Sequence, residues 1–257
     1  MFIRITKPII SSYSTIYMNT RSFILILFTV ITGMLSCKNK DTPPAVPPTT
    51  AFGIINATAD TLNYYINGTR QNNLSSIYSS GFTGYVQTIT GLQNYSFKKT
   101  GSQVVLFSTP YTLDTATYYS MFVAGETADK AFLTADLLDA AADSLSSDST
   151  DSSTMVRFVN AAPSAGTLSF SITKGDTINK GGTVNFNSCA FKYAGSFTRI
   201  KLGYKEVKIY QAGITKPAID TTLILQGNVV YTLFVKGMLN GKGNAAIGVG
   251  LIVNDTQ

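Results

Sequence analysis

Side chains alternate in character along Tyr204-Lys205-Glu206-Val207-Lys208-Ile209-Tyr210. Because successive residues of a β-strand point to opposite faces, Lys205, Val207 and Ile209 share one face and Glu206 and Lys208 share the other. This period of two predicts a half-buried strand.

The same kind of pattern continues from residue 51 to the end of the chain. Short runs of valine, isoleucine, phenylalanine, tyrosine and threonine are broken by glycine and asparagine about every 8–12 residues. No long helical period appears among them. These features predict an all-β protein built from β-sandwiches.

The chain also contains an internal repeat. A shift of 112 residues without a gap superposes glycine on glycine and apolar residue on apolar residue. The pairs are Gly91/Gly203, Gly101/Gly213, Gly125/Gly237, Leu113/Leu225, Tyr119/Tyr231, Phe122/Phe234 and Val123/Val235. Recurring glycines indicate turns that need a positive φ. The repeat predicts two homologous sandwich modules, at about 51–140 and 154–257.

The beginnings of the two modules are also alike. Phe52-Gly53-Ile54-Ile55-Asn56-Ala57 matches Val156-Arg157-Phe158-Val159-Asn160-Ala161, and the second phrase continues as Ala162-Pro163-Ser164-Ala165-Gly166. With the later strand 202–213, this phrase resembles the bacterial extracellular family named domain of unknown function 4397. The second module matches well, whereas Thr58-Ala59-Asp60 makes the first a degenerate copy. The resemblance implies an immunoglobulin-like or transthyretin-like sandwich in secreted or surface-attached proteins, and it brings no established catalytic residues.

The N-terminal region has the layout of a lipoprotein signal. Arg21 precedes an apolar run that ends in Ser36-Cys37, and the run from Ser22 to Ser36 is shorter than the roughly 20 residues of a permanent membrane helix. We therefore expect residues 1–36 to be removed, with Met18 as an alternative start, and Cys37 to be lipidated. Lipidation would anchor the chain in a membrane. In some Gram-negative bacteria an aspartate directly after the lipidated cysteine holds a lipoprotein in the inner membrane. Lys38 stands at that position here, which favours the outer membrane.

Two segments are expected to act as connectors. Residues 37–50 hold four of the eight prolines, which indicates a semi-rigid tether behind Cys37. Residues 141–153 are rich in serine and aspartate, which indicates a solvated linker. The three aspartates of this linker lack the ligand spacing of a calcium loop, so we expect no metal site there.

The composition disfavours catalysis. The chain has no histidine, no tryptophan and two cysteines, so histidine-based triads and zinc sites with imidazole ligands are excluded. Glu126 and Glu206 are the only glutamates. Cys189 lies between aromatic residues and is expected to be a small buried hydrophobe. We therefore predict a protein that is not an enzyme and uses no cofactor; a hydrolase that uses carboxylates alone is the remaining catalytic alternative.

The positive charge lies in the second module. The formal charge of +6 becomes +3 without residues 1–36, and residues 154–257 carry 11 basic against 4 acidic groups. Arg199, Lys201 and Lys208 are the candidate patch for an anionic ligand, on two strands expected to form a hairpin around Gly203. The alternative is a solvated strand face that discourages edge-to-edge aggregation.

These features predict a lipid-anchored cell-envelope protein with a non-catalytic binding or structural role. The alternative is an accessory lipoprotein that binds polysaccharide and presents it to an importer or a hydrolase. The expected partners are the membrane, through Cys37, and either a polysaccharide or another envelope protein; nucleic acid is not expected. The sequence leaves open which side of the outer membrane the protein faces and whether the two modules pack together.

Overall fold

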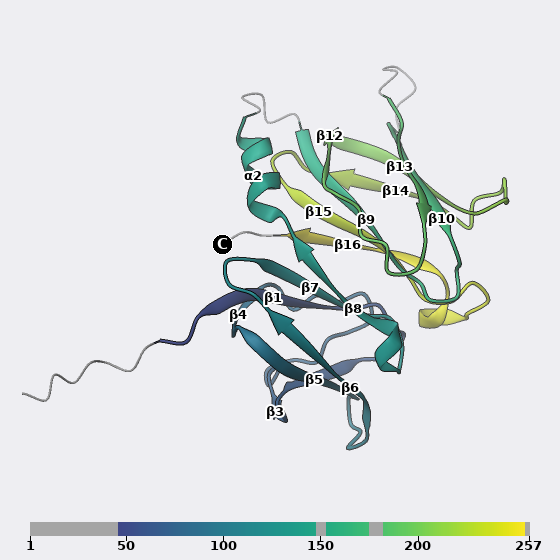
Figure 1. Cartoon of the computed structure of the whole chain (residues 1–257). Helices are drawn as coiled ribbons and strands as arrows, with labels where there is room; N and C mark the ends of the chain where they lie inside the picture. The colour runs from purple at the N-terminus through teal and green to yellow at the C-terminus, as the bar shows by residue number, and fades with distance from the viewer. Residues whose placement is uncertain (1–45, 148–152, 175–181, 255–257) are drawn as a thin grey trace, which may run out of the picture. The chain divides into compact units, whose positions relative to one another are not determined.

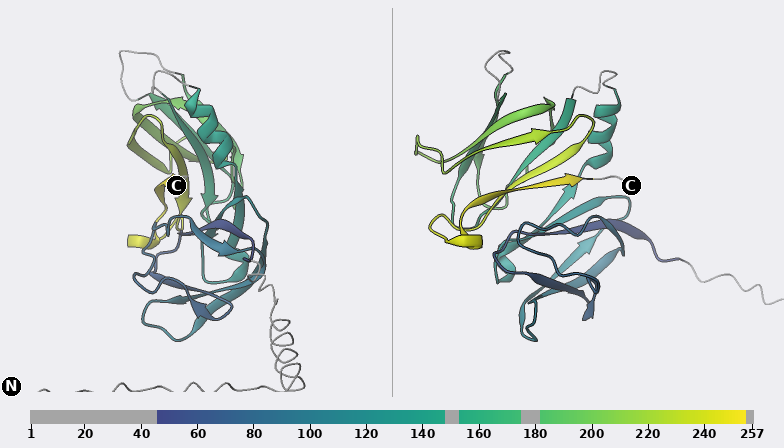
Figure 2. Two further views of the ribbon diagram at one scale, coloured as in Figure 1. Left: turned by 90° about the vertical axis from the view of Figure 1, so that its left-hand side faces the viewer. Right: turned by 180° about the vertical axis from the view of Figure 1, so that it is seen from behind.

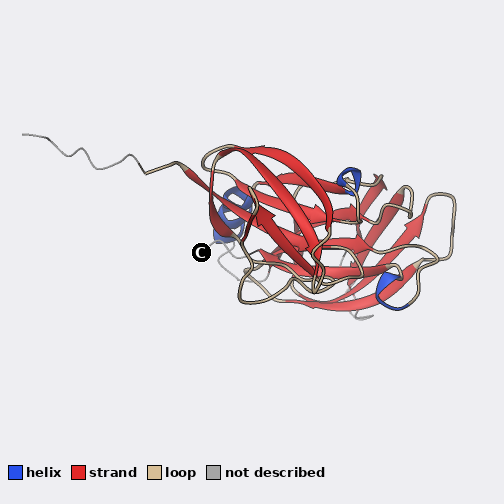
Figure 3. Ribbon diagram, turned by 90° about the horizontal axis from the view of Figure 1, so that it is seen from below, coloured by secondary structure: helices blue, strands red, loops and turns tan. Residues whose placement is uncertain are grey.

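The computed structural model describes residues 46–147, 153–174 and 182–254. The first half contains eight strands: β1 (Thr49–Asn56), β2 (Leu62–Ile66), β3 (Thr69–Arg70), β4 (Val86–Ile89), β5 (Gly91–Lys99), β6 (Val105–Leu113), β7 (Tyr118–Val123) and β8 (Ala131–Asp136). The second half contains eight more: β9 (Ser153–Ala161), β10 (Leu168–Lys174), β11 (Val184–Cys189), β12 (Thr198–Lys201), β13 (Gly203–Gln211), β14 (Ile219–Leu225), β15 (Val230–Lys236) and β16 (Gly248–Asn254). Two 3-10 turns, η1 (Ala128–Lys130) and η2 (Gly243–Ala245), and one α-helix, α2 (Leu138–Ser146), complete the described elements (Figure 1). The prediction of an all-β fold with two sandwich halves is confirmed (Figure 3).

Both halves have the same strand order. In the first half the sheets run β4-β1-β7-β8 and β3-β2-β5-β6; in the second they run β12-β9-β15-β16 and β11-β10-β13-β14. The number of each strand in the second half is therefore eight higher than that of the equivalent strand in the first half, as in β1 and β9. The pairs β1–β7 and β9–β15 are parallel, and the other pairs are antiparallel. We call β4-β1-β7-β8 and β12-β9-β15-β16 the inner sheets, and the other two the outer sheets.

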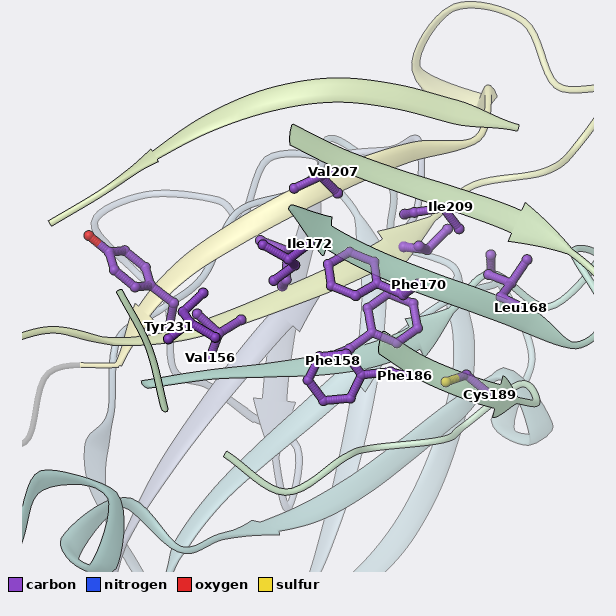
Figure 4. Close-up of a cluster of buried hydrophobic side chains, with 14 of the residues drawn as sticks. Val156, Phe158, Leu168, Phe170, Ile172, Phe186, Cys189, Val207, Ile209 and Tyr231 are labelled. Carbon is purple, nitrogen blue, oxygen red and sulfur yellow. The ribbon is translucent and has the colours of Figure 1, made fainter. Parts of the chain in front are cut away.

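Each half has its own core between its inner and outer sheet. In the second half, Phe158 of β9 stacks on Phe170 of β10 at 4.4 Å between ring centroids, and Phe186 packs beside them (Figure 4). Val207 and Ile209 are fully buried there, and Lys205 is 4% exposed, which confirms the predicted alternation of β13. The first half is filled in the same manner, around Phe52, Tyr95 and Phe97 and their neighbours.

Strands β1 and β9 of the inner sheets differ from β13 because they are buried on both faces. Every residue of β9 is buried, and so are the last five residues of β1. On β1, Ile54 faces the core of the first half, whereas Ile55 faces a separate cluster shared with the second half. Strands buried on both faces have nearly continuous apolar runs instead of alternation.

The prediction of a hairpin between the strands around Gly203 is wrong. β12 pairs with β9 in the inner sheet, whereas β13 pairs with β10 and β14 in the outer sheet. Gly203 has a φ of +100° at the point where the chain crosses between the sheets, and Gly91 has a φ of +89° at the equivalent crossing. The expectation of a positive φ is therefore confirmed at Gly91 and Gly203, although the turn here joins two sheets. Of the other repeated glycines, Gly101, Gly213 and Gly237 also have a positive φ, whereas Gly125 does not.

Helix α2 occupies the first part of the segment that was expected to be a solvated linker. Leu138, Ala141 and Leu145 lie on one helix face and are buried against Met155 and Val230. The helix runs beside β9 (Figure 2). Three apolar residues suffice here because neighbouring side chains cover them, and helices in proteins draw most of their stability from such packing.

Candidate binding sites

The two inner sheets contact each other through the faces that point away from their own cores. Phe122 of β7 and Phe234 of β15 are equivalent in the 112-residue repeat, and their ring centroids lie 5.9 Å apart. Phe122 also stacks on Phe132 at 5.1 Å. Ile55, Val159 and Ile252 belong to the same buried cluster. We call this contact the junction; it shows that the two halves pack together.

A buried ion pair lies next to this cluster. Arg157 of β9 donates from Nη1 to Oδ1 of Asp136 at 2.5 Å, and their side chains are 3% and 0% exposed. Asp136 also accepts hydrogen bonds from the hydroxyls of Ser120 at 2.5 Å, Tyr85 at 2.7 Å and Thr134 at 2.8 Å. Both carboxylate oxygens are therefore fully engaged, so this aspartate is a structural group and not a free base.

The arginine is held from three sides. Its Nε donates to Thr232 at 2.8 Å, and its guanidinium carbon lies 4.8 Å from the centre of the Phe197 ring. Its Nη2 is buried without a hydrogen-bond partner among the described residues. Burial raises the pKa of Tyr85 well above its usual range, and the nearby carboxylate of Asp136 raises it further. The Tyr85 hydroxyl therefore remains a hydrogen-bond donor. The network therefore links β7 and β8 of the first inner sheet to β9 and β15 of the second.

The two copies of the Asn-Ala phrase form similar loops. Asn56 and Asn160 are fully buried, and each holds the loop that follows it. Asn56 donates to the carbonyls of Asp60 at 2.7 Å and Ile77 at 2.8 Å, whereas Asn160 donates to the carbonyl of Cys189 at 2.9 Å. In both loops the asparagine oxygen accepts a backbone N–H two residues later. The shared phrase therefore encodes a loop shape.

A hollow of about 520 Å³ lies where these two loops meet. Its apolar lining comes from both halves and includes Ala57, Ala124, Pro163 and Met238. Asp60, Glu126 and Lys130 also line it. Lys99 bridges the two carboxylates at 2.8 and 2.7 Å, and these contacts raise the pKa of Lys99. We call this hollow the junction hollow; its volume is in the range of ordinary ligand sites.

A lysine and a serine also meet across the junction. Lys236 of the second half donates to Oγ of Ser79 at 2.9 Å and to the carbonyl of Asn244 at 3.3 Å. Burial lowers the pKa of Lys236. Ser79 donates its own proton to the carbonyl of Thr58 at 2.5 Å, so its hydroxyl is used as a structural donor. This contact adds a second polar clamp between the halves.

A second hollow, also of about 520 Å³, lies on the first half alone. It is lined by the loop between β3 and β4, in particular by Gln71, Asn73, Ser75 and Tyr78. We call it the Tyr78 hollow. The Tyr78 side chain is 69% exposed, although it belongs to a loop that is otherwise hydrogen-bonded to the sheet.

The structure does not bring the three predicted basic residues together. Arg199 and Lys201 are exposed on β12 of the inner sheet, whereas Lys208 lies on β13 of the outer sheet. Lys208 pairs with Glu206 at 2.8 Å, and this contact raises its pKa. Arg199 donates from Nη2 to the carbonyl and hydroxyl of Ser144 in α2. A cation near the last carbonyls of a helix stabilises it, so Arg199 has a structural contact.

Arg199→Ala is expected to loosen the end of α2. The change removes the donor to Ser144 and to Ser147, so the amides of the last helical turn should exchange with deuterium several-fold faster. Hydrogen exchange with mass spectrometry measures this directly. Lys201→Ala, on the same strand, is the matched control and should leave that turn unchanged; equal exchange in both variants would contradict the helix contact.

The remaining predicted positions have different outcomes. Cys189 is fully buried, and burial raises the pKa of its thiol to about 11, as expected for a small buried hydrophobe. Cys37 and the residues of the expected signal lie outside the described residues. Within the described ranges, no group of three or more metal-binding side chains comes together, and no helix is long and apolar enough to span a bilayer.

Sequence reasoning missed Asp136, Arg157 and the Tyr78 loop. One signal for the ion pair was available, because Arg157 interrupts the apolar run Val156-Arg157-Phe158-Val159. A charged residue in a strand that is buried on both faces requires a buried partner. The identity of that partner depends on how the two sheets pack, which the local pattern does not contain.

Comparisons with known proteins agree with the resemblance in part. A family model described as "Domain of unknown function (DUF4397)" matches residues 52–171, which cover most of the first half and reach β10. The match thus lies mainly on the half that the sequence phrases suggested was degenerate. A search of curated proteins finds no significant match.

Three solved structures are distantly similar to this chain. A DUF3823 family protein from Parabacteroides merdae is 12% identical, with 70% of this chain and 100% of that chain covered and a TM-score of 0.18. A DUF3823 family protein from Bacteroides ovatus is 10% identical over the same shares, also with a TM-score of 0.18. A protein from Bacteroides fragilis described as a candidate cell adhesion protein is 8% identical, with 78% and 85% covered and a TM-score of 0.21. At these TM-scores the likenesses carry no argument for this chain.

Proposed function

We propose that this chain is a lipid-anchored cell-envelope protein in which two β-sandwich modules, 51–140 and 154–257, form one non-catalytic binding body. The lipid would be attached at Cys37, and residues 37–50 would hold the body away from the outer membrane. The paired modules would bind the ligand, and the N-terminal segment would anchor the chain.

The junction hollow is the observation that carries the binding role. It exists only because the two modules pack together, and both copies of the Asn-Ala phrase supply its walls. The buried ion pair of Asp136 and Arg157 joins the same two modules elsewhere in their contact. A concave site that is already formed before a ligand arrives is the usual form of a binding site.

A second candidate function is the presentation of polysaccharide to an importer or a hydrolase in the same envelope. The Tyr78 hollow favours it, because an exposed tyrosine lies there beside amide and hydroxyl side chains. This function would use the same anchored body and the same fold.

Cys37→Ser is expected to abolish lipid attachment. The thioether to the diacylglycerol needs the thiol, so cells given radioactive palmitate should label the wild-type protein and leave the variant unlabelled. Cys189→Ser is the matched control, since its thiol is buried in the core of the second half and labelling should persist. Equal labelling of wild type and Cys37→Ser would overturn the anchor.

A further inference from the structure

Two large apolar side chains stand out on the loop between β3 and β4. Leu74 is fully exposed and Tyr78 is 69% exposed. Single exposed apolar residues are common on protein surfaces. These two, however, lie close together on one loop and both line the Tyr78 hollow.

This loop is held firmly to the sheet. Ile77 forms an isolated β-bridge with Leu62, with backbone hydrogen bonds of 2.8 and 2.9 Å, and its own side chain is buried. Asn72 accepts from the backbone N–H of Tyr64 at 3.1 Å and donates to the carbonyl of Ser75 at 3.0 Å. The loop therefore presents Tyr78 in one position, and a ligand would not have to order it on binding.

The polar lining of the Tyr78 hollow is neutral. Its hydrogen-bonding side chains are amides and hydroxyls, and none of the residues that line it in the described structure is charged. These side chains belong to Tyr64, Gln71, Asn72, Asn73, Ser75, Ser76, Tyr78 and Thr83. Asn72, Ser76 and Thr83 already form hydrogen bonds within the protein. The junction hollow differs, because Asp60, Glu126 and Lys130 line it. An ionic ligand would find no counter-charge within the Tyr78 hollow itself; charged side chains line a neighbouring hollow of about 660 Å³ that Leu74 and Tyr78 also border, and these are Asp60, Arg70 and Lys99.

Sugar hydroxyls fit such a lining. Each sugar hydroxyl both donates and accepts hydrogen bonds, and an amide side chain offers an acceptor and two donors at once. Asn73 and Ser75 are exposed at the edge of the hollow, where they can face a ligand. The ring of Tyr78 adds a flat apolar face of the kind that covers the C–H face of a pyranose, while its hydroxyl stays in water.

We propose that the Tyr78 hollow binds a neutral saccharide. This inference rests on the second candidate function, the presentation of polysaccharide, and narrows its ligand class to neutral saccharides. A protein partner is less well matched, because a stable protein interface needs about 800 Å² from each side with an apolar centre. Here the exposed apolar groups are two side chains beside a polar hollow.

The test is titration calorimetry of the full-length protein with defined hexasaccharides. The neutral probes are maltohexaose, cellohexaose, mannohexaose and xylohexaose, and hexagalacturonate is the anionic probe. We expect at least one neutral probe to bind and Tyr78→Ala to weaken that binding at least tenfold. Tyr204→Ala is the matched control, because Tyr204 is 63% exposed on β13 of the other half; it should change the affinity less than twofold. Asn73→Ala should weaken binding about threefold or more.

Three results would overturn the proposal: no neutral probe binds, hexagalacturonate alone binds, or Tyr78→Ala binds as well as wild type. A photo-crosslinker placed at position 78 that captures an envelope protein, with no saccharide bound, would replace the saccharide with a protein partner. Chromatography of the probes after titration tests the non-catalytic role separately, since shortened probes would contradict it. Palmitate labelling tests the anchor separately. If the non-catalytic role or the anchor were contradicted, the calorimetry would still show whether the Tyr78 hollow binds a saccharide.

Discussion

Asp136→Ala is expected to lower the free energy of unfolding by about 3–5 kcal/mol. The change leaves the Arg157 guanidinium, whose side chain is 3% exposed, without its counter-charge. It also removes the acceptor of the hydroxyls of Tyr85, Ser120 and Thr134. Urea unfolding followed by far-UV circular dichroism measures the loss, and tyrosine fluorescence is a second probe because the chain has no tryptophan.

Two variants make this result specific. Lys99→Met removes the two ion pairs with Asp60 and Glu126, whose lysine is 37% exposed, and it should change the free energy of unfolding by less than about 1 kcal/mol. The double change Asp136→Leu with Arg157→Met removes both charges together, and it should recover much of the loss. A loss below about 1 kcal/mol for Asp136→Ala would show that water reaches the pair, contrary to its burial.

The fold class could be predicted because its signals are local. The alternation of Tyr204–Tyr210 follows from the geometry of one strand with one face in the core, and Val207 and Ile209 are buried as expected. Glycines at repeated positions mark turns that other residues adopt only at a cost. Gly91 and Gly203 therefore pointed to real turns with positive φ.

The errors arose where a local signal fits two arrangements. A glycine between two strands marks a hairpin and a crossing between sheets equally well, so the pattern around Gly203 did not show that β12 and β13 lie in different sheets. The three apolar residues of α2 are too few to reveal a helix among serines and aspartates. The position of β12 depends on its pairing with β9, which is distant in sequence. The helix depends on packing against Met155 of β9 and against Val230. Neither contact is visible in the local pattern.

The candidate sites were harder to predict for the same reason. Arg199 and Lys208 looked like one patch when their strands were placed side by side, but one of them contacts α2 and the other pairs with Glu206. The junction hollow needs both modules in contact, which the sequence left open. The repeated Asn-Ala phrase could be recognised in the sequence. Its structural role could not, because that role depends on the hydrogen bonds by which Asn56 and Asn160 hold their loops.

Phe234→Ala is expected to destabilise the protein by about 3–5 kcal/mol, with effects in both halves. Phe234 is fully buried, contacts Phe122 of the first half, and its ring covers Gly250, where an added Cβ would meet the ring at 2.2 Å. Removing the ring leaves a cavity at the junction that this glycine is too small to fill. Hydrogen exchange should therefore become faster in β7 of the first half as well as in β15 and β16.

Phe170→Ala is the matched control for the junction. Phe170 is a phenylalanine of nearly equal burial, 1% exposed, but it lies within the core of the second half. Phe170→Ala should lower the free energy of unfolding by a similar amount. Its faster hydrogen exchange should be confined to the strands β9 to β16. If Phe234→Ala gave the same one-sided pattern as Phe170→Ala, the junction would contribute little to stability. Faster exchange in both halves for Phe234→Ala alone would show that the two sandwiches stabilise each other, as a binding hollow built from both of them requires.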